Sequence, residues 1–310
     1  MVISNYDRST LFAVLIGPST IVSIFVLYHF LRSPPLRSAL NNHAIILLVS
    51  FGLVEAVTDI VWQIYTYRNG VALIFTPAFC LAWTYLGSFP YIAVHILMAW
   101  ASIERHILIF YPNWFGTRKK RLYFHYLPLV TSILYPAVFY FLTLIFPACD
   151  IGFNYNRRQC GRYVCISNIS WLALWDSIAH YIMPAFLTVI FSAILLVRVF
   201  YSRYRARQRI DWRKYKKLTA QLLPISVLYT ALQLPPMILY AAYSAGVPYS
   251  VGGNYYSDGI YFTYWVILLT PFASVTSLPE WKRKCRNLVF FWRKRNAVGH
   301  ITAAALTARY

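Results

Sequence analysis

Negative charge is scarce in this sequence. Only nine of its 310 residues are Asp or Glu, and charged residues of both signs make up 12% of the chain, against about 25% in an average soluble domain. Hydrophobic residues supply 59% of the chain and aromatic residues 18%. A chain of this composition cannot present most of its surface to water, which excludes an ordinary soluble protein and indicates a membrane protein.

Residue patterns of catalytic and metal centres are missing as well. No group of histidines has the spacing of metal ligands, and no Ser or Cys has an evident general base beside it in the sequence. We therefore expect neither an enzyme nor a bound metal or organic cofactor.

Long apolar runs fill most of the chain. A helix needs about 20 apolar residues to cross a bilayer, and seven runs of this kind occur, at residues 11–31, 43–65, 81–103, 124–146, 171–197, 218–243 and 255–278. Prolines within these runs predict kinks, because membrane helices tolerate proline better than soluble ones. The sequence predicts an all-α membrane protein, with a seven-transmembrane helix bundle over residues 1–278.

The Lys and Arg residues predict the orientation of this bundle. With the N-terminus outside, 24 of the 29 fall on the inner face of the membrane and five on the outer face, as the positive-inside rule requires. The net charge of +20 is then a topology signal and an attraction to anionic membrane lipid. We therefore expect a multi-pass protein of the plasma membrane. Because the basic residues are dispersed among the inner loops, we expect no binding of nucleic acid.

The cysteines and the one glycosylation sequon agree with this orientation. Four cysteines fall outside, where disulfides persist, and allow two bridges: Cys80, Cys149, Cys160 and Cys165. Asn168, in the sequon Asn168-Ile169-Ser170, also falls outside and is a candidate for glycosylation, although it lies close to the fifth span.

Residues 279–310 read as an amphipathic helix and a short cytoplasmic tail. Trp281, Cys285, Leu288 and Trp292 recur at helical spacing, and basic residues fill the other face, as an interfacial helix requires. Cys285 is a candidate for palmitoylation, and an idle cytosolic thiol is the alternative.

Three consecutive ionisable residues, Glu104-Arg105-His106, interrupt the inner end of the third span. Cys80 precedes Arg105 by 25 residues, which corresponds to roughly 37 Å of helix, or one crossing of a bilayer. Ile109 follows one turn later and Pro112 ends the segment. An ordinary cluster of charges at the membrane edge is the simplest interpretation of the triplet alone.

Together these residues resemble the rhodopsin-like (class A) G-protein-coupled receptors. That family has a third-helix cysteine bridged to the second outer loop, then an Asp/Glu-Arg-Tyr triplet, an aliphatic residue and a proline at these offsets. His106 replaces the tyrosine. Further matches are Pro184, Leu234-Pro235-Pro236, the basic residues Lys214, Lys216 and Lys217, and Thr270-Pro271. The chain is similar to a divergent lineage of this family, such as an expanded invertebrate set of orphan receptors.

Several family features are absent. The second span has Phe51 or Gly52 at the depth where the family has an aspartate, Gln233 replaces an aromatic residue, and no tyrosine follows Pro271 at the family's offset. Many receptors of the family hold a sodium ion on that aspartate. Without it, a hard cation lacks its anionic oxygen ligand, so we expect no effect of sodium, with Glu55 as the only near substitute.

The resemblance implies roles for particular residues. Cys80 would be bridged to Cys165, the outer-loop cysteine nearest the fifth helix, or else to Cys160, with Cys149 to Cys160 as the second bridge. Glu104 would pair with Arg105 and hold the inner helix ends together, and the released arginine would meet the G protein. A connector below the ligand would comprise His95, Pro184, Tyr229, Gln233, Pro235 and Pro271. A hydrogen bond from His95 to Tyr229 is possible, and a plain buried histidine is the alternative.

The outer pocket is less defined by the sequence. Amine receptors of the family have an aspartate seven residues after the third-helix cysteine, where this chain has Gly87, so a protonated monoamine fits poorly. Asp176 and His180 lie one turn apart in the outer half of the fifth span and could contact a polar ligand, pack, or pair with another helix.

The sequence therefore predicts a receptor that senses an unknown extracellular ligand and activates a heterotrimeric G protein through the inner end of the third helix. A transporter or channel is the alternative, with Glu55, Asp59, His95 and Asp176 as a polar pathway. No inverted repeat is visible that would favour it.

Overall fold

The computed structural model describes residues 3–146, 152–162, 164–167, 169–205, 212–275 and 278, and these residues are almost entirely helical, with no strand among them. The helices are α1 (Asn5–Arg32), α2 (Pro34–Arg37), α3 (Leu40–Glu55), α4 (Val61–Asn69), α5 (Pro77–Leu86), α6 (Phe89–Phe110), α7 (Arg118–Arg121), α8 (Leu127–Tyr140), α9 (Val164–Ser167), α10 (Ser170–Asp176), α11 (Met183–Arg205), α12 (Trp212–Ser244) and α13 (Gly253–Val275). The chain is an all-α protein, as its composition predicted.

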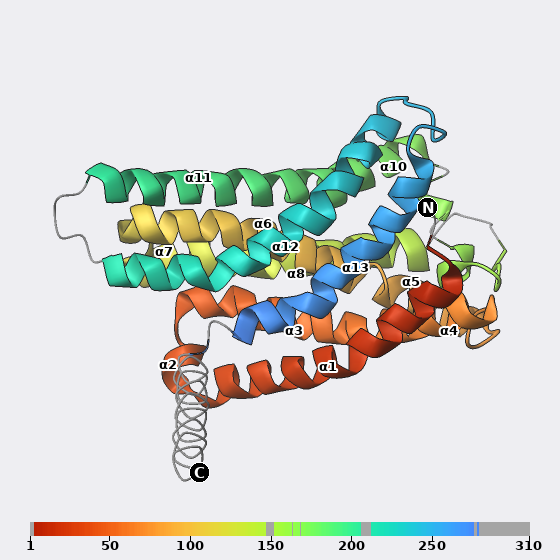
Figure 1. The fold of residues 1–310 in the computed structure, drawn as a ribbon, viewed down its shortest axis with the longest axis horizontal. Coiled ribbons are helices and arrows are strands. Elements are labelled where there is room, and N and C mark those ends of the chain that lie inside the picture. The colour runs from red at the N-terminus through yellow and green to blue at the C-terminus, as the bar shows by residue number, and fades with distance from the viewer. Residues whose placement is uncertain are drawn as a thin grey trace, which may run out of the picture.

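Six segments are long and apolar enough to cross a membrane: Asn5–Arg32, Leu40–Asn69, Pro77–Phe110, Arg118–Ile145, Ser170–Arg198 and Pro224–Tyr243. They coincide with the first six predicted spans. The seventh long helix, α13, packs against α12 and α1 (Figure 1) but is less apolar, because its first half carries Asn254, Ser257, Asp258 and several tyrosines. A seventh crossing and an outer N-terminus stay predictions.

Short π-helical turns join the helices within several of these segments. They are η1 (Ala56–Ile60) between α3 and α4, η3 (Leu122–Tyr126) before α8, η4 (Phe141–Ile145) after α8, and η6 (Ser177–Ile182) before α11. A π-helical turn shifts the helix register locally and is frequent at functional sites. Here these turns hold four buried polar residues, Asp59, His125, Ser177 and His180.

Proline is accommodated inside several of the long helices. Pro18, Pro136, Pro235 and Pro271 lie within α1, α8, α12 and α13 without ending them, as predicted for a membrane bundle. The third segment differs from the prediction of one unbroken helix, because it breaks between α5 and α6 at residues 87 and 88. Pro90 near the start of α6 lacks an N–H and favours a helix start there.

The bundle has two chemically different ends (Figure 1). One end is called the disulfide end, since Cys80 lies there. It holds the N-terminus, α4, α5, α10 and the connection from α12 to α13. The opposite end, which holds α2, α7 and the last turn of α6, is called the basic end. Helix α6 packs against α3, α8 and α11 and is the central element that connects the two ends.

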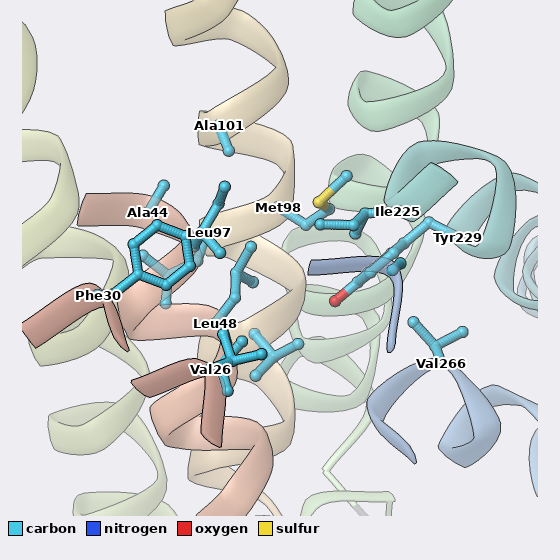
Figure 2. Packing of buried hydrophobic residues seen from close by; sticks show 14 of the residues in the cluster. Val26, Phe30, Ala44, Leu48, Leu97, Met98, Ala101, Ile225, Tyr229 and Val266 are labelled. Atoms are coloured by element: carbon cyan, nitrogen blue, oxygen red, sulfur yellow. The ribbon is translucent and has the colours of Figure 1, made fainter. Parts of the chain in front are cut away.

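The interior toward the basic end is apolar. Figure 2 shows side chains from α1, α3, α6, α12 and α13 converging there, including Phe30, Leu48, Leu97, Met98 and Ile225. Close helix approach relies on small residues, as is common in membrane bundles. A Cβ added at Gly259 of α13 would lie only 3.0 Å from the Pro236 ring of α12, so this glycine allows those two helices to pack.

Candidate functional site

The disulfide at the outer loop joins Cys80 of α5 to Cys160, with Cα atoms 5.6 Å apart. The preferred partner Cys165 is therefore wrong and the alternative Cys160 is correct; Cys165 is disulfide-bonded elsewhere. Closeness to the fifth helix along the sequence was misleading, because residues 153–161 fold back over α5. The backbone N–H of Ala72 donates to the Tyr155 carbonyl at 2.7 Å and Cys160 is thereby brought to Cys80.

The predicted second bridge from Cys149 to Cys160 is also excluded, since Cys160 is already bonded to Cys80. Cys149 itself lies outside the described residues. So do the sequon asparagine Asn168, Cys285 and the whole predicted amphipathic helix, residues 279–310.

Asp59 of η1 lies beneath this outer loop and is completely buried. Its Oδ1 accepts a hydrogen bond from Trp83 Nε1 at 2.7 Å, and its Oδ2 accepts one from Gln63 Nε2. Arg158 Nη2 lies 3.6 Å from the same Oδ2. Asp59 thus binds together the second and third segments and the outer loop.

Gly87, at the break between α5 and α6, makes this arrangement possible. A Cβ at this position would lie 2.5 Å from both Asp59 Oδ1 and Gln159 Nε2. Such distances are far below van der Waals contact, so a side chain here would displace the carboxylate or the loop. The residue that argued against a monoamine ligand therefore also has a structural role.

Glu55 lies one turn before Asp59 and is also completely buried. Neither of its carboxyl oxygens has a hydrogen-bond partner among the described residues, although Asp59 is close enough to interact with it electrostatically. Arg158 is the cation that interacts with both acids. One guanidinium thus faces two buried carboxyl groups.

Arg158 lies in the outer loop, within the short 3-10 helix η5 (Arg158–Gly161). Burial alone would lower the pKa of its guanidinium, but the Asp59 carboxylate, aided by Tyr67, Tyr91 and Glu55, outweighs burial and raises the pKa. The charged guanidinium lies over the ring of Tyr264, 4.7 Å from its centroid, in a cation–π contact. Its Nε has no hydrogen-bond partner among the described residues.

A cavity of about 280 Å³ opens beside Arg158 at the disulfide end. It is lined by Gly87, Ser88, Tyr91, Arg158, Gln159, Tyr181, Met237, Tyr240, Tyr256, Ile260 and Tyr264. The lining combines five tyrosines with one formal charge, which is positive. Of the three residues that the sequence suggested for a ligand pocket, only Gly87 lines this cavity.

The other two, Asp176 and His180, face α8. Asp176 Oδ1 accepts hydrogen bonds from the Tyr140 hydroxyl and is paired with His180 Nδ1, both at 2.7 Å. His180 Nε2 lies 2.9 Å from the Tyr135 hydroxyl. This arrangement is the pairing with another helix that the sequence left open as an alternative to ligand contact.

The residues of the predicted connector lie in the middle of the bundle, in α6, α11, α12 and α13. His95 Nδ1 lies 2.6 Å from the Tyr91 carbonyl and must donate to it, which leaves Nε2 as an acceptor. The possible hydrogen bond to Tyr229 is not formed; instead the two rings meet edge to face, with their centroids 5.8 Å apart. The Tyr229 hydroxyl and the Gln233 amide are buried and without hydrogen-bond partners in the described part of the chain.

Glu104 at the basic end pairs with His125 of η3, and the ion pairs among described residues do not include Glu104 with Arg105. Arg105 still interacts electrostatically with the Glu104 carboxyl, and its release on activation stays a prediction. Adjacent residues of a helix point in directions about 100° apart, so the two side chains leave α6 on different sides. Arg105 is buried at the end of the same helix.

The Glu104–His125 pair extends to a second histidine. His125 Nε2 lies 2.7 Å from His43 Nδ1, and His43 Nε2 lies 2.8 Å from the carbonyl of Arg37. The carbonyl can only accept, so His43 donates to it from Nε2 and accepts at Nδ1 from His125. The Nδ1 of His125 and the Glu104 carboxyl then share one further proton, which closes a chain from α6 through η3 to α3.

The remaining two predicted coupling residues lie beside this chain. His106 Nε2 lies 2.9 Å from Arg198 Nη1 of α11, and Pro112 begins the exposed 3-10 turn after α6.

Comparison with models of known protein families found no match, and comparison with curated proteins found none either. The function of the chain therefore has to be inferred from the geometry of these two ends.

Proposed function

We propose that this chain is a seven-helix receptor of the plasma membrane, with its N-terminus outside, that binds an extracellular ligand at the disulfide end and activates a heterotrimeric G protein at the basic end. The observation that carries this proposal is the position of α6. Its first turns provide Ser88 and Tyr91 to the cavity, and its last turns hold Glu104 and Arg105. These 22 residues extend over roughly 33 Å.

The polar residues between the two ends provide a route for a signal. Tyr91 lines the cavity and its hydroxyl lies 2.6 Å from Thr263 Oγ1 of α13. One turn deeper come His95, Tyr229 and Gln233, whose buried polar atoms have hydrogen-bonding capacity left over. Such a cluster can adopt a second arrangement in which these groups bond to one another, and a ligand that moves Tyr91 would favour it.

The basic end supplies a switch of the kind that a G protein could sense. The chain Glu104–His125–His43 joins α6 to two neighbouring segments and stabilises the closed helix ends. When these ends separate, the buried Arg105 becomes available to carbonyl groups of an inserted partner helix, which its planar donor fork suits. The net positive charge of the chain favours anionic lipid at that side.

The alternative, a transporter or channel, has less support. Asp176, one of its four proposed polar residues, is bonded within the cluster with His180 and Tyr140. Between Glu55 and the basic end lies the apolar cluster that includes Leu48, Leu97 and Met98 (Figure 2). A polar pathway would have to pass through it.

The test is guanine-nucleotide exchange by the purified protein in lipid nanodiscs, on a panel of purified heterotrimeric G proteins. Wild type should accelerate exchange on at least one of them, and Arg105→Ala should abolish the acceleration. The matched control is Arg32→Ala, which removes an exposed arginine from the same end of the bundle. No exchange on any G protein, together with ion or proton flux in liposomes that is lost in Glu55→Gln, would overturn the receptor in favour of a transporter.

A further inference from the structure

The residues that line the cavity at the disulfide end carry positive charge and no negative charge. Among its lining residues Arg158 is the one formal charge, and none is an acid. A cationic ligand would therefore meet a like charge and no counter-charge on the cavity wall, which is unfavourable in a desolvated site. The charge of the lining favours an anionic ligand.

Arg158 has donors to offer such a ligand. Its nearest contact with Asp59 is 3.6 Å, well beyond the roughly 2.7–2.9 Å of a charge-assisted hydrogen bond. Both oxygens of Asp59 already accept from Trp83 and Gln63. The Nε of Arg158 is buried and has no hydrogen-bond partner among the described residues, so its pairing with Asp59 is loose and incomplete.

The guanidinium is also held in place. The main chain has left-handed conformations at the next two residues, with φ of 50° at both Gln159 and Cys160, and such non-glycine positions persist only where their surroundings fix them. Here the disulfide fixes Cys160 and the Thr84 hydroxyl donates to the Gln159 carbonyl at 3.1 Å. The Tyr264 ring supports the guanidinium through the cation–π contact. A planar donor fork on a fixed support suits a carboxylate, which accepts two parallel hydrogen bonds.

The rest of the lining defines the body of the ligand. Five of the eleven lining residues are tyrosines, and aromatic walls favour a flat apolar ligand through stacking or edge contacts. A cavity of roughly 150 Å³ holds benzene, so the 280 Å³ here admits one aromatic ring with a short substituent. Long acyl chains and peptides exceed this volume.

We propose that this cavity binds a small aromatic carboxylate, with the ligand carboxylate on Arg158 and its ring among Tyr91, Tyr240 and Tyr256. The proposal rests on the receptor function proposed above and names its ligand class. The ligand carboxylate would accept from donors of Arg158 that Asp59 leaves unused, and the ring would contact Tyr91, which begins the polar route along α6. One ligand would thus act on both the outer loop and the centre of the bundle.

The experiment measures equilibrium binding to the purified full chain in nanodiscs, without a G protein. The probes are phenylacetate, 3-phenylpropanoate and 3-(4-hydroxyphenyl)propanoate, each compared with the corresponding alcohol and amine, and with hexanoate as an acid that lacks a ring. At least one aromatic acid should bind ten times or more tighter than its alcohol, its amine and hexanoate. This comparison uses wild type only, so it does not depend on the folding of any variant.

Arg158→Gln should weaken binding of that acid at least tenfold, and Arg158→Lys, which keeps the charge but loses the fork, should weaken it less. Arg157→Gln is the matched control, because it removes the exposed neighbouring arginine and should leave binding unchanged. The proposal is overturned if no aromatic acid binds, if the alcohol binds as tightly as the acid, or if folded Arg158→Gln binds like wild type. Acid binding without nucleotide exchange would instead overturn the receptor function alone.

Discussion

The stability of the bundle should respond very differently to the same substitution at the two buried acids of the second segment. Glu55 and Asp59 are one turn apart and both have 0% exposure. Asp59 accepts hydrogen bonds from Trp83 and Gln63, whereas the oxygens of Glu55 have no partner among the described residues. Asp59→Ala should therefore destabilise the bundle, and Glu55→Ala should change its stability little.

The magnitude follows from the donors that Asp59→Ala leaves behind. A buried donor without an acceptor costs about 1–3 kcal/mol, and the indole N–H of Trp83 cannot turn into an acceptor. The amide of Gln63 adds a second such cost, and Arg158 loses a carboxylate oxygen that lies 3.6 Å away. The two donors together cost about 2–6 kcal/mol, which corresponds, at roughly 2 °C per kcal/mol for a large chain, to a midpoint lowered by about 4–12 °C.

Glu55→Ala has two opposing effects. It removes a buried acid that has no hydrogen-bond partner among the described residues, which relieves a desolvation cost, and it leaves a small cavity, which costs about 1–2 kcal/mol. The two should cancel to within about 1 kcal/mol. The same substitution one turn away is thus the internal control.

The assay is thermal unfolding in detergent followed by loss of monodisperse protein, with all variants heated at one scan rate because unfolding of membrane proteins is commonly irreversible. Trp83→Phe added to Asp59→Ala should recover part of the loss, since removing both partners of a buried hydrogen bond costs less than removing one. Equal midpoints for Asp59→Ala and Glu55→Ala, or no recovery in the double variant, would refute the assignment of Asp59 as the structural acid.

Three further predictions concern the two ends. Cys80→Ser and Cys160→Ser should each lower stability by at most about 4 kcal/mol, and the double variant no further, as read by the same unfolding assay. Glu104→Gln and His125→Gln should each raise basal nucleotide exchange about tenfold, because each removes a buried charge-assisted bond that stabilises the closed helix ends; unchanged exchange in both would contradict this role. Gly87→Ala should lower the unfolding midpoint by more than Gly17→Ala, whose Cβ would meet open space, and equal midpoints would contradict the tight packing at the break.

The helical segments were predictable because the property that defines them is local. A run of about 20 apolar residues must form a helix in a bilayer, whatever its neighbours are, and the first six runs became the six long apolar helices. The sequence also indicates the break at residues 87 and 88, because Gly87 lies shortly before Pro90. It was missed because proline inside an apolar run was interpreted only as a kink.

The partners of the charged residues were not predictable in the same way. Glu104 meets His125 and Asp59 meets Arg158 through contacts between different segments, and no local pattern specifies them. The adjacent side chains of Glu104 and Arg105 leave α6 in different directions, and only the fold shows that His125 of another segment meets the Glu104 carboxyl. In the sequence, Arg158 is only one of the five basic residues predicted on the outer face. Its position two residues before Cys160 fixes it to the loop over the cavity.

Sodium provides the last prediction, because many rhodopsin-like receptors hold this ion and the sequence of this chain predicts no effect of it. At the depth of the family's aspartate, Phe51 contacts the ring of Phe89 and Gly52 faces Ile267. The hydroxyl of Thr270 donates to the carbonyl of Val266 in its own helix at 2.6 Å. The described residues contain no group of three or more His, Cys, Asp or Glu that could hold a metal ion.

A hard cation needs several oxygen ligands, with carboxylates among them, and Glu55 offers one carboxyl whose nearest cation is Arg158. We therefore expect the same unfolding midpoint in sodium chloride and in N-methyl-D-glucamine chloride at equal ionic strength. Lithium chloride at that strength controls for the size of the cation. A rise specific to sodium that disappears in Glu55→Gln would mean that the Glu55 carboxyl, which has no hydrogen-bond partner in the described part of the chain, binds the ion. The sodium site would then have moved one turn along α3.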